Sequence, residues 1–175
     1  ELCKVGIVKD TYMEDLYMWG LLLKDHMNGG HGNQSQHYAG VAFDVGQNLN
    51  ETQRTVLWNS ANNSKIWSYV EPISLTPSWV HFDDRTGTPA CSTGGYPLVR
   101  QRSKGVYVLI AQDGLNTLGY NTGGLDGVFG TRTYTAVRNF QSKVGLSVDG
   151  IVGCNTWRAL QERVVGKGKT STTIN

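Results

Sequence analysis

The sequence contains few cysteines and prolines and no long hydrophobic segment. Its 175 residues include three cysteines, four prolines and four histidines. Because the cysteines are odd in number and have no CxxC spacing, we expect neither a disulfide framework nor a structural zinc site built from cysteine. A single bridge, for example between Cys3 and Cys91, stays open. Apolar runs such as 21–23 are far shorter than the roughly 20 residues that cross a bilayer, so we expect no membrane partner.

Glycine, in contrast, is abundant. The 22 glycines predict many tight turns. With 39% hydrophobic and 17% charged residues, the composition is that of a globular protein. The length suits one ordinary domain or two small ones.

The charges divide the chain into two unequal parts. Residues 1–88 contain 6 basic and 10 acidic residues, a net charge of −4, and residues 89–175 contain 10 basic and 4 acidic residues, a net charge of +6. All four histidines lie in the first part. This division predicts an acidic, histidine-bearing module followed by a basic one. The basic residues are not interleaved with aromatic ones in a stripe, so we expect no nucleic-acid partner.

Hydrophobic periodicity in the first part predicts a mixture of strands and helices. We expect strands over 1–8, 40–45, 66–74 and 79–83 and helices over 11–27 and 51–62. Asn50 and Gln53 have the spacing of a capping box, which favours a helix that begins at residue 51. The glycines and prolines that follow residue 84 indicate a linker, which we place at 89–104.

The second part contains an internal repeat. Asp-Gly-Val-Phe-Gly at 126–130 is followed by Asp-Gly-Ile-Val-Gly at 149–153, and each copy precedes a predicted helix. Glycine permits the positive φ angles of tight turns, and the apolar pair of each copy can fill a core. With one helix before the first copy, residues 105–165 are expected to form a compact three-helix unit. Residues 166–175 are expected to form a flexible tail.

Two short segments of the first part place histidine and aspartate on strand faces. Side chains alternate between the two faces of a strand. In the first segment Asp44 shares its face with small residues, which leave space beside the carboxylate, and His37 lies just upstream. In the second segment His81 shares its face with Asp83, and the residues that alternate with them, Val80 and Phe82, are apolar. Both segments can therefore contribute to one polar pocket.

Two imidazoles and one carboxylate are enough to hold a catalytic zinc ion. Three protein ligands leave a fourth position for water, and the metal lowers the pKa of that water to about 7. The hydroxide can attack an amide carbonyl while the metal polarises the carbonyl oxygen. A lone His-x-Asp pair is more typical of a hydrogen-bonded surface pair. The prediction of a Zn²⁺ site therefore rests on the combination of His37 and Asp44 with His81.

The same residues resemble a known family. The pattern consists of Ser35-x-His37-x-x-Gly40-x-Ala42-x-Asp44 followed by Trp79-x-His81. It is similar to the zinc D-Ala-D-Ala carboxypeptidases and to the related L-alanyl-D-glutamate endopeptidases of phage lysins. The resemblance covers roughly residues 1–88. It implies a small α+β domain with an antiparallel sheet, in which His37, Asp44 and His81 are the zinc ligands.

Residues 105–165 resemble the peptidoglycan-binding domain of cell-wall hydrolases. The matching positions are Leu115, Leu118-Gly119-Tyr120, Asp126-Gly127-x-Phe129-Gly130, Thr133, Ala136-Val137, Phe140-Gln141, Gly145-Leu146, Asp149-Gly150-Ile151-Val152-Gly153 and Thr156-Trp157. Nearly all of them have the character of core and turn residues, so the resemblance identifies the domain without identifying the residues that touch a ligand.

Two positions depart from the peptidase pattern. The family places an acid three residues before the last histidine as general base, and this chain has Ser78 there. Asp83 is our substitute as catalytic base, with Glu71 as a weaker candidate, and Asp83 can equally be a salt-bridge or hydrogen-bonding partner of His81. The family also carries an upstream arginine that steadies the oxyanion. Residues 1–34 contain no arginine, and Lys9 can replace only its charge.

These observations predict a monomeric peptidoglycan hydrolase of the endolysin or autolysin type, secreted or associated with the cell wall. Zinc-activated water would cleave a peptide bond in a stem or cross-link peptide, and the basic module would hold the enzyme on the wall. Carboxypeptidase and endopeptidase activity both stay open. The alternative is a zinc-containing wall-binding protein without turnover, which the serine at 78 and the absent arginine favour.

Overall fold

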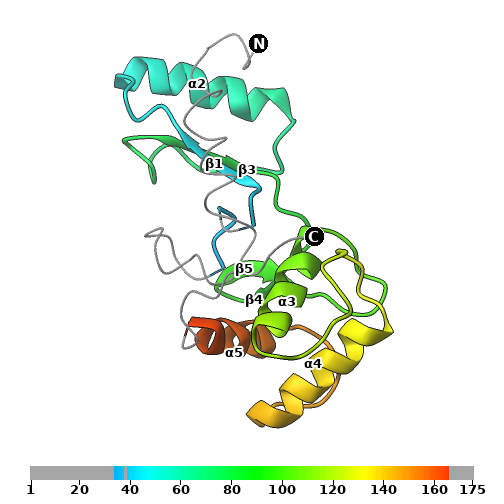
Figure 1. Ribbon diagram of the computed structural model, residues 1–175. Helices are drawn as coiled ribbons and strands as arrows, with labels where there is room; N and C mark the ends of the chain where they lie inside the picture. Colours follow the sequence, from blue (N-terminus) through cyan, green and yellow to red (C-terminus); the bar gives the residue numbers. More distant parts are fainter. Residues whose placement is uncertain (1–33, 38, 166–175) are drawn as a thin grey trace. The chain divides into compact units, whose positions relative to one another are not determined.

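The computed structural model describes residues 34–37 and 39–165 (Figure 1). The strand expected over 1–8, the helix expected over 11–27 and the tail at 166–175 lie outside the described residues, as do Cys3 and Lys9. Within the described part, the chain divides into two compact units, one with residues 40–86 and the other with residues 34–37, 39 and 87–165. Among the described residues, no helix is both long and apolar enough to cross a membrane.

The first unit is a three-stranded antiparallel sheet with one helix. Its elements are β1 (Ala42–Val45), α2 (Glu51–Ser64), β2 (Tyr69–Val70) and β3 (Val80–Asp83), and the strand order is β1-β3-β2. The capping box is confirmed, because the Asn50 side chain accepts from the Gln53 backbone and the Gln53 side chain accepts from the Asn50 backbone. The strand expected over 66–74 is only two residues long. Pro72 cannot extend the ladder, and its carbonyl instead accepts from Leu75 in a turn.

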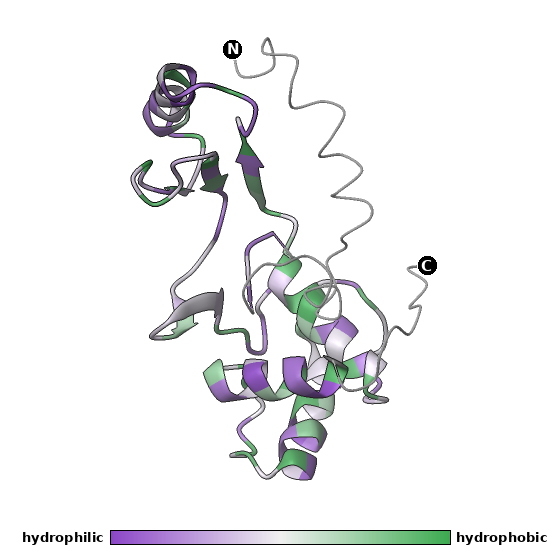
Figure 2. Cartoon of the chain, turned by 90° about the vertical axis from the view of Figure 1, so that its left-hand side faces the viewer, coloured by the Kyte–Doolittle hydropathy of each residue, from purple (hydrophilic) through white to green (hydrophobic). Residues whose placement is uncertain are grey.

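One face of this sheet forms the hydrophobic core of the unit. Hydrophobic and hydrophilic residues alternate along the strands, as the colours of Figure 2 show. The buried cluster contains Val45, Ala61, Val80 and Phe82, with Phe43, Leu57, Trp58, Trp67 and Val70 packed against it. The ring centroids of Trp67 and Phe82 lie 4.4 Å apart. Since α2 and the apolar side chains cover this face, the polar residues of the strands are left on the other face.

The second unit contains a hairpin and three helices. These are β4 (Pro89–Cys91), β5 (Gly94–Pro97), α3 (Val106–Thr117), α4 (Thr131–Val144) and α5 (Cys154–Val165). The three predicted helices are present, and the C-cap of α4 is Gly145, which has a φ of 76°. Gln34 and Gln36 also belong to this unit, since Gln34 accepts from the Tyr96 backbone and Gln36 from the Tyr107 hydroxyl.

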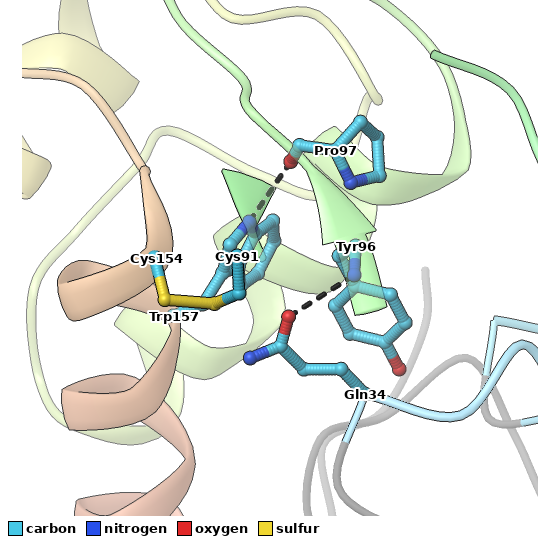
Figure 3. Close-up of a disulfide and its surroundings, with 6 residues drawn as sticks. All are labelled: Gln34, Cys91, Tyr96, Pro97, Cys154 and Trp157. Atoms are coloured by element: carbon cyan, nitrogen blue, oxygen red, sulfur yellow. Dashed lines mark hydrogen bonds between the residues drawn. A yellow bond between two sulfur atoms is a disulfide. The ribbon is translucent and has the colours of Figure 1, made fainter. Parts of the chain in front are cut away.

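The segment 89–104 is an ordered part of the second unit and does not act as a linker. Its glycines and prolines form the β4-β5 hairpin, and Tyr96 within it is 1% exposed. The Tyr96 and Trp157 rings pack edge to face, with their centroids 5.2 Å apart. Trp157 Nε1 donates to the Pro97 carbonyl at 2.9 Å (Figure 3). The buried Tyr96 ring and the hydrogen bond to Pro97 therefore hold a segment whose composition is that of a linker.

A disulfide joins the hairpin to α5. Cys91 is bonded to Cys154, 63 residues further along the chain (Figure 3). The pairing of Cys3 with Cys91 that the sequence left open is therefore wrong. The hairpin brings Cys91 next to Cys154, the first residue of α5. The spacing of the cysteines in the sequence does not predict this proximity.

Candidate metal centre

The candidate site occupies the polar face of the three-stranded sheet. The register pairs Asp44 of β1 with His81 of β3, and Ala42 with Asp83. On the other side of β3, Tyr69 of β2 pairs with Asp83. Because cross-strand partners point to the same face, one sheet places all the polar side chains of this group next to one another.

Asp44 and His81 are in direct contact. Asp44 Oδ1 lies 2.7 Å from His81 Nδ1, and the side chains are 22% and 12% exposed. His37, the third residue of the predicted set, belongs to the other compact unit, so its place in the site stays the prediction drawn from the sequence. The resemblance implies His37, Asp44 and His81 as the zinc ligands, and this role stays a prediction for all three.

The second nitrogen of His81 faces Asp83. His81 Nε2 lies 3.1 Å from Asp83 Oδ2, and Asp83 is completely buried. Arg85 donates to both oxygens of this carboxylate: Nε and the backbone N–H reach Oδ1 at 2.7 and 3.0 Å, and Nη2 reaches Oδ2. Asp83 thus has the geometry of the hydrogen-bonding partner that the sequence allowed as an alternative, while its role as base stays a prediction.

Arg85 is fixed from a second side by an aromatic ring. Its guanidinium carbon lies 4.0 Å from the centroid of the Tyr69 ring. A guanidinium over an aromatic face gains cation–π attraction while its N–H groups remain available in the plane. Arg85 therefore lies between the Tyr69 ring and the Asp83 carboxylate.

The electrostatics of the site favour a positive charge on His81. Burial lowers the pKa of His81, but hydrogen bonds to Asp44 and Asp83 and the charges of both carboxylates raise it, to about 9 overall. Burial raises the pKa of Asp83, but hydrogen bonds from Arg85 and His81 lower it, to about 2 overall. At neutral pH, without metal, the protonated ring of His81 thus donates its Nδ1–H to Asp44 and its Nε2–H to Asp83.

The donor set fits a zinc ion. Two ligand atoms on a tetrahedral zinc, each about 2.1 Å from the metal, are about 3.4 Å apart. The 2.7 Å between Asp44 Oδ1 and His81 Nδ1 is that of a charge-assisted hydrogen bond. Replacing the shared proton by a metal therefore requires the two atoms to separate by about 0.7 Å, a movement that side-chain rotation can supply.

Glu71, the second candidate for the base, lies next to this centre. The Glu71 N–H donates to the His81 carbonyl at 2.9 Å, which continues the β2-β3 ladder and makes Glu71 the next cross-strand neighbour of His81. Sequence reasoning missed Arg85. The signal was available, because an arginine two residues after a strand aspartate has the spacing for a hydrogen-bonded pair.

Comparison with known proteins identifies the domain in the second unit. Residues 104–160 match the family described as a putative peptidoglycan binding domain. The chain therefore contains a peptidoglycan-binding domain, and the expectation from the sequence for this segment is confirmed.

The similar proteins include cell-wall lytic enzymes. The spore cortex-lytic enzyme of Bacillus cereus is 44% identical over 63 residues, which are 36% of this chain and 24% of that enzyme. The N-acetylmuramoyl-L-alanine amidase CwlM of Mycobacterium tuberculosis is 43% identical over 53 residues, 30% of this chain and 13% of the amidase. The solved SleB N-terminal domain is 42% identical, with a TM-score of 0.38 over 38% of this chain and 92% of that one. The chain thus spans about a quarter or less of these two lytic enzymes.

Proposed function

We propose that the chain is a zinc-dependent peptidoglycan hydrolase that cleaves a peptide bond in a stem or cross-link peptide of the cell wall. The observation that carries the proposal is the contact between Asp44 and His81, at 2.7 Å on the polar face of a sheet. The two residues belong to the peptidase signature, and the same chain contains a peptidoglycan-binding domain at 104–160.

In this proposal His37, Asp44 and His81 hold the metal. When bound, zinc supplies a water of lowered pKa, about 7, and polarises the scissile carbonyl. Asp44 contributes the negative charge of the ligand set. His81 contributes a neutral imidazole and must first lose the proton that Asp44 and Asp83 stabilise on it.

A carboxylate must accept the proton of the attacking water. Asp83 is the base predicted from the sequence, and Glu71 is the second candidate. Both oxygens of Asp83 accept hydrogen bonds from Arg85, and its side chain has no exposure. Glu71 is partly exposed and neighbours His81 across the strands. The hydrogen bonding of Asp83 favours Glu71 as the base, since a base needs direct or water-mediated access to the proton.

The peptidoglycan-binding domain would keep the enzyme on its insoluble substrate. Tethering raises the local concentration of scissile bonds without any new contact in the catalytic unit. The lytic activities named for the similar proteins support the wall as the site of action, and so a wall-associated location. Whether the bond is D-Ala-D-Ala, L-Ala-D-Glu or part of a bridge depends on loops around the site.

Digestion of purified cell wall tests the proposal. The zinc-loaded chain should release new amino termini over time, and mass spectrometry of the muropeptides identifies the bond. His81→Ala should abolish release but retain wall binding, because the binding domain is untouched.

The alternative is a wall-binding protein that holds zinc but does not turn over. Ser78, in the place where the peptidase pattern has an acid, favours it. Binding to the wall with no new amino termini, in zinc-loaded wild-type protein, would support this alternative and contradict the hydrolase.

A further inference from the structure

We propose that Arg85 and Asp83 are positioning residues for His81, so that the Arg85 guanidinium sets the affinity of the metal centre without touching metal or substrate. This inference rests on the proposed function. It assigns a role to an arginine outside the peptidase signature and reassigns Asp83 from base to support.

The first step is that both carboxylate oxygens of Asp83 already have hydrogen-bonding partners. Its Oδ1 accepts from Arg85 Nε at 2.7 Å and from the Arg85 backbone N–H at 3.0 Å. Its Oδ2 accepts from Arg85 Nη2 and lies 3.1 Å from His81 Nε2. A buried carboxylate with four such contacts has a fixed orientation, and breaking any of them leaves a charge without compensation.

The second step is the orientation of the imidazole. Because Asp83 accepts from Nε2–H, the other ring nitrogen, Nδ1, is directed at Asp44. Rotation of the ring by half a turn would remove both contacts at once. The carboxylate therefore fixes both the ring angle and the nitrogen that carries the proton, which is how partners beyond the ligands tune metal sites in general.

The third step is the support of Arg85. The Tyr69 ring lies under its guanidinium at 4.0 Å, and Tyr69 is the cross-strand partner of Asp83. The guanidinium presents Nε and Nη2 to the two carboxylate oxygens as a fork. A lysine ammonium cannot reproduce this pair of bonds together with the stacking. Arg85→Lys keeps the charge and removes the geometry, so it isolates the positioning role.

This arrangement also explains why Arg85 does not replace the upstream arginine of the peptidase pattern. A group that steadies an oxyanion must direct its donors at the substrate. The Nε and Nη2 donors of Arg85 are directed at Asp83 instead. We therefore infer that Arg85 acts on the metal ligand His81, through Asp83, and does not contact the substrate.

The test measures zinc affinity of the full chain by competition with a chromophoric chelator. Asp83→Asn and Arg85→Lys should each weaken zinc binding by roughly 10- to 100-fold. The double variant should be no weaker than the worse single variant, because both changes break one chain of contacts. Asp84→Asn, which alters the adjacent exposed carboxylate, and Arg100→Lys, at an exposed arginine, are matched controls and should stay within about twofold of wild type.

Long-range proton–nitrogen NMR of the zinc-loaded wild type gives a readout independent of folding in the variants. We expect the metal-induced shift on Nδ1 of His81 and a protonated Nε2. A shift on Nε2 would overturn the proposal. So would an Asp83→Asn variant that binds zinc like wild type but has lost turnover, because that result identifies Asp83 as the base. If His81→Ala itself keeps full zinc affinity, the proposed metal centre fails as a whole.

Discussion

Gln112 and Gln141 make the same set of hydrogen bonds in two successive loops of the peptidoglycan-binding domain. Each amide nitrogen donates to an aspartate, a backbone carbonyl and a threonine: Asp126, Val128 and Thr133 for Gln112, and Asp149, Ile151 and Thr156 for Gln141. Each amide oxygen accepts from the glycine after the aspartate. Both glutamines are 1% exposed. The repeat in the sequence is thus a repeated loop, held by one buried amide per copy.

We predict that Gln112→Leu and Gln141→Leu destabilise the domain by similar amounts. Leucine removes the acceptor of the Gly127 or Gly150 N–H and all donors of the amide nitrogen, at about 1–3 kcal/mol for each buried group left unsatisfied. We expect each variant to lower the free energy of unfolding by about 2–4 kcal/mol in denaturant titrations. Gln101→Leu, at an exposed position, is the control and should change the unfolding free energy little. Unchanged stability in either core variant would contradict the role of the amides.

A second prediction concerns the glycine of the second loop. Gly150 has a φ of +73°, and a Cβ there would lie 2.1 Å from a ring carbon of Tyr134. Gly150→Ala combines backbone strain with a clash, so we expect a loss of about 2 kcal/mol or more in unfolding free energy. Gly153→Ala is the matched control, because an added Cβ meets nothing within 4 Å. Equal stabilities for the two variants would refute this reading of the loop.

The disulfide gives a third prediction. Closing a loop across a separation of 63 residues restricts the unfolded chain, with an effect of about 4 kcal/mol in the chain-entropy treatment. Cys91→Ser and Cys154→Ser should therefore each lower the melting temperature, and reductant should do the same to the wild type only. A melting temperature insensitive to reductant would mean that the bridge contributes nothing to stability.

The fourth prediction concerns pH and the metal-free protein. The pKa of His81 is raised on folding, to about 9. A group of this kind stabilises the fold fully below its unfolded pKa of about 6.5, and its contribution is lost as pH rises through its folded pKa. Chelator-treated protein should thus become less stable between pH 7 and pH 10 in thermal unfolding. His81→Gln should flatten this slope, and an unchanged slope would exclude His81 as its source.

The sequence predicts the local features of this fold better than its long-range ones. The capping box of Asn50 and Gln53, the alternation around Asp44 and His81, and the Asp-Gly loops are set by neighbours within a few residues, and the structure contains all of them. The hydrogen-bonding role of the two glutamines was not predicted from the sequence. Gln112 is 14 positions from its aspartate and Gln141 is 8 positions from its own, so the contacts form only in the folded loops.

The errors have a common physical origin. Segment 89–104 has the composition of a linker, yet Tyr96 and Cys91 are buried by α5, which lies about 60 residues later in the chain. The partner of Cys91 could not be predicted for the same reason, because it lies 63 residues further along the sequence. The support that Arg85 gives to Asp83 is local in sequence, but its importance depends on Tyr69, which reaches it only across the sheet.

Zinc content after dialysis tests the central claim most directly. Elemental analysis of the purified full chain, loaded with zinc and then dialysed against a weak chelator, should give one zinc per chain for the wild type. Asp44→Asn and His81→Ala should each retain almost none, while Asp84→Asn should retain the wild-type amount. A wild-type chain that keeps no zinc, or a His81→Ala variant that keeps it fully, would contradict the account.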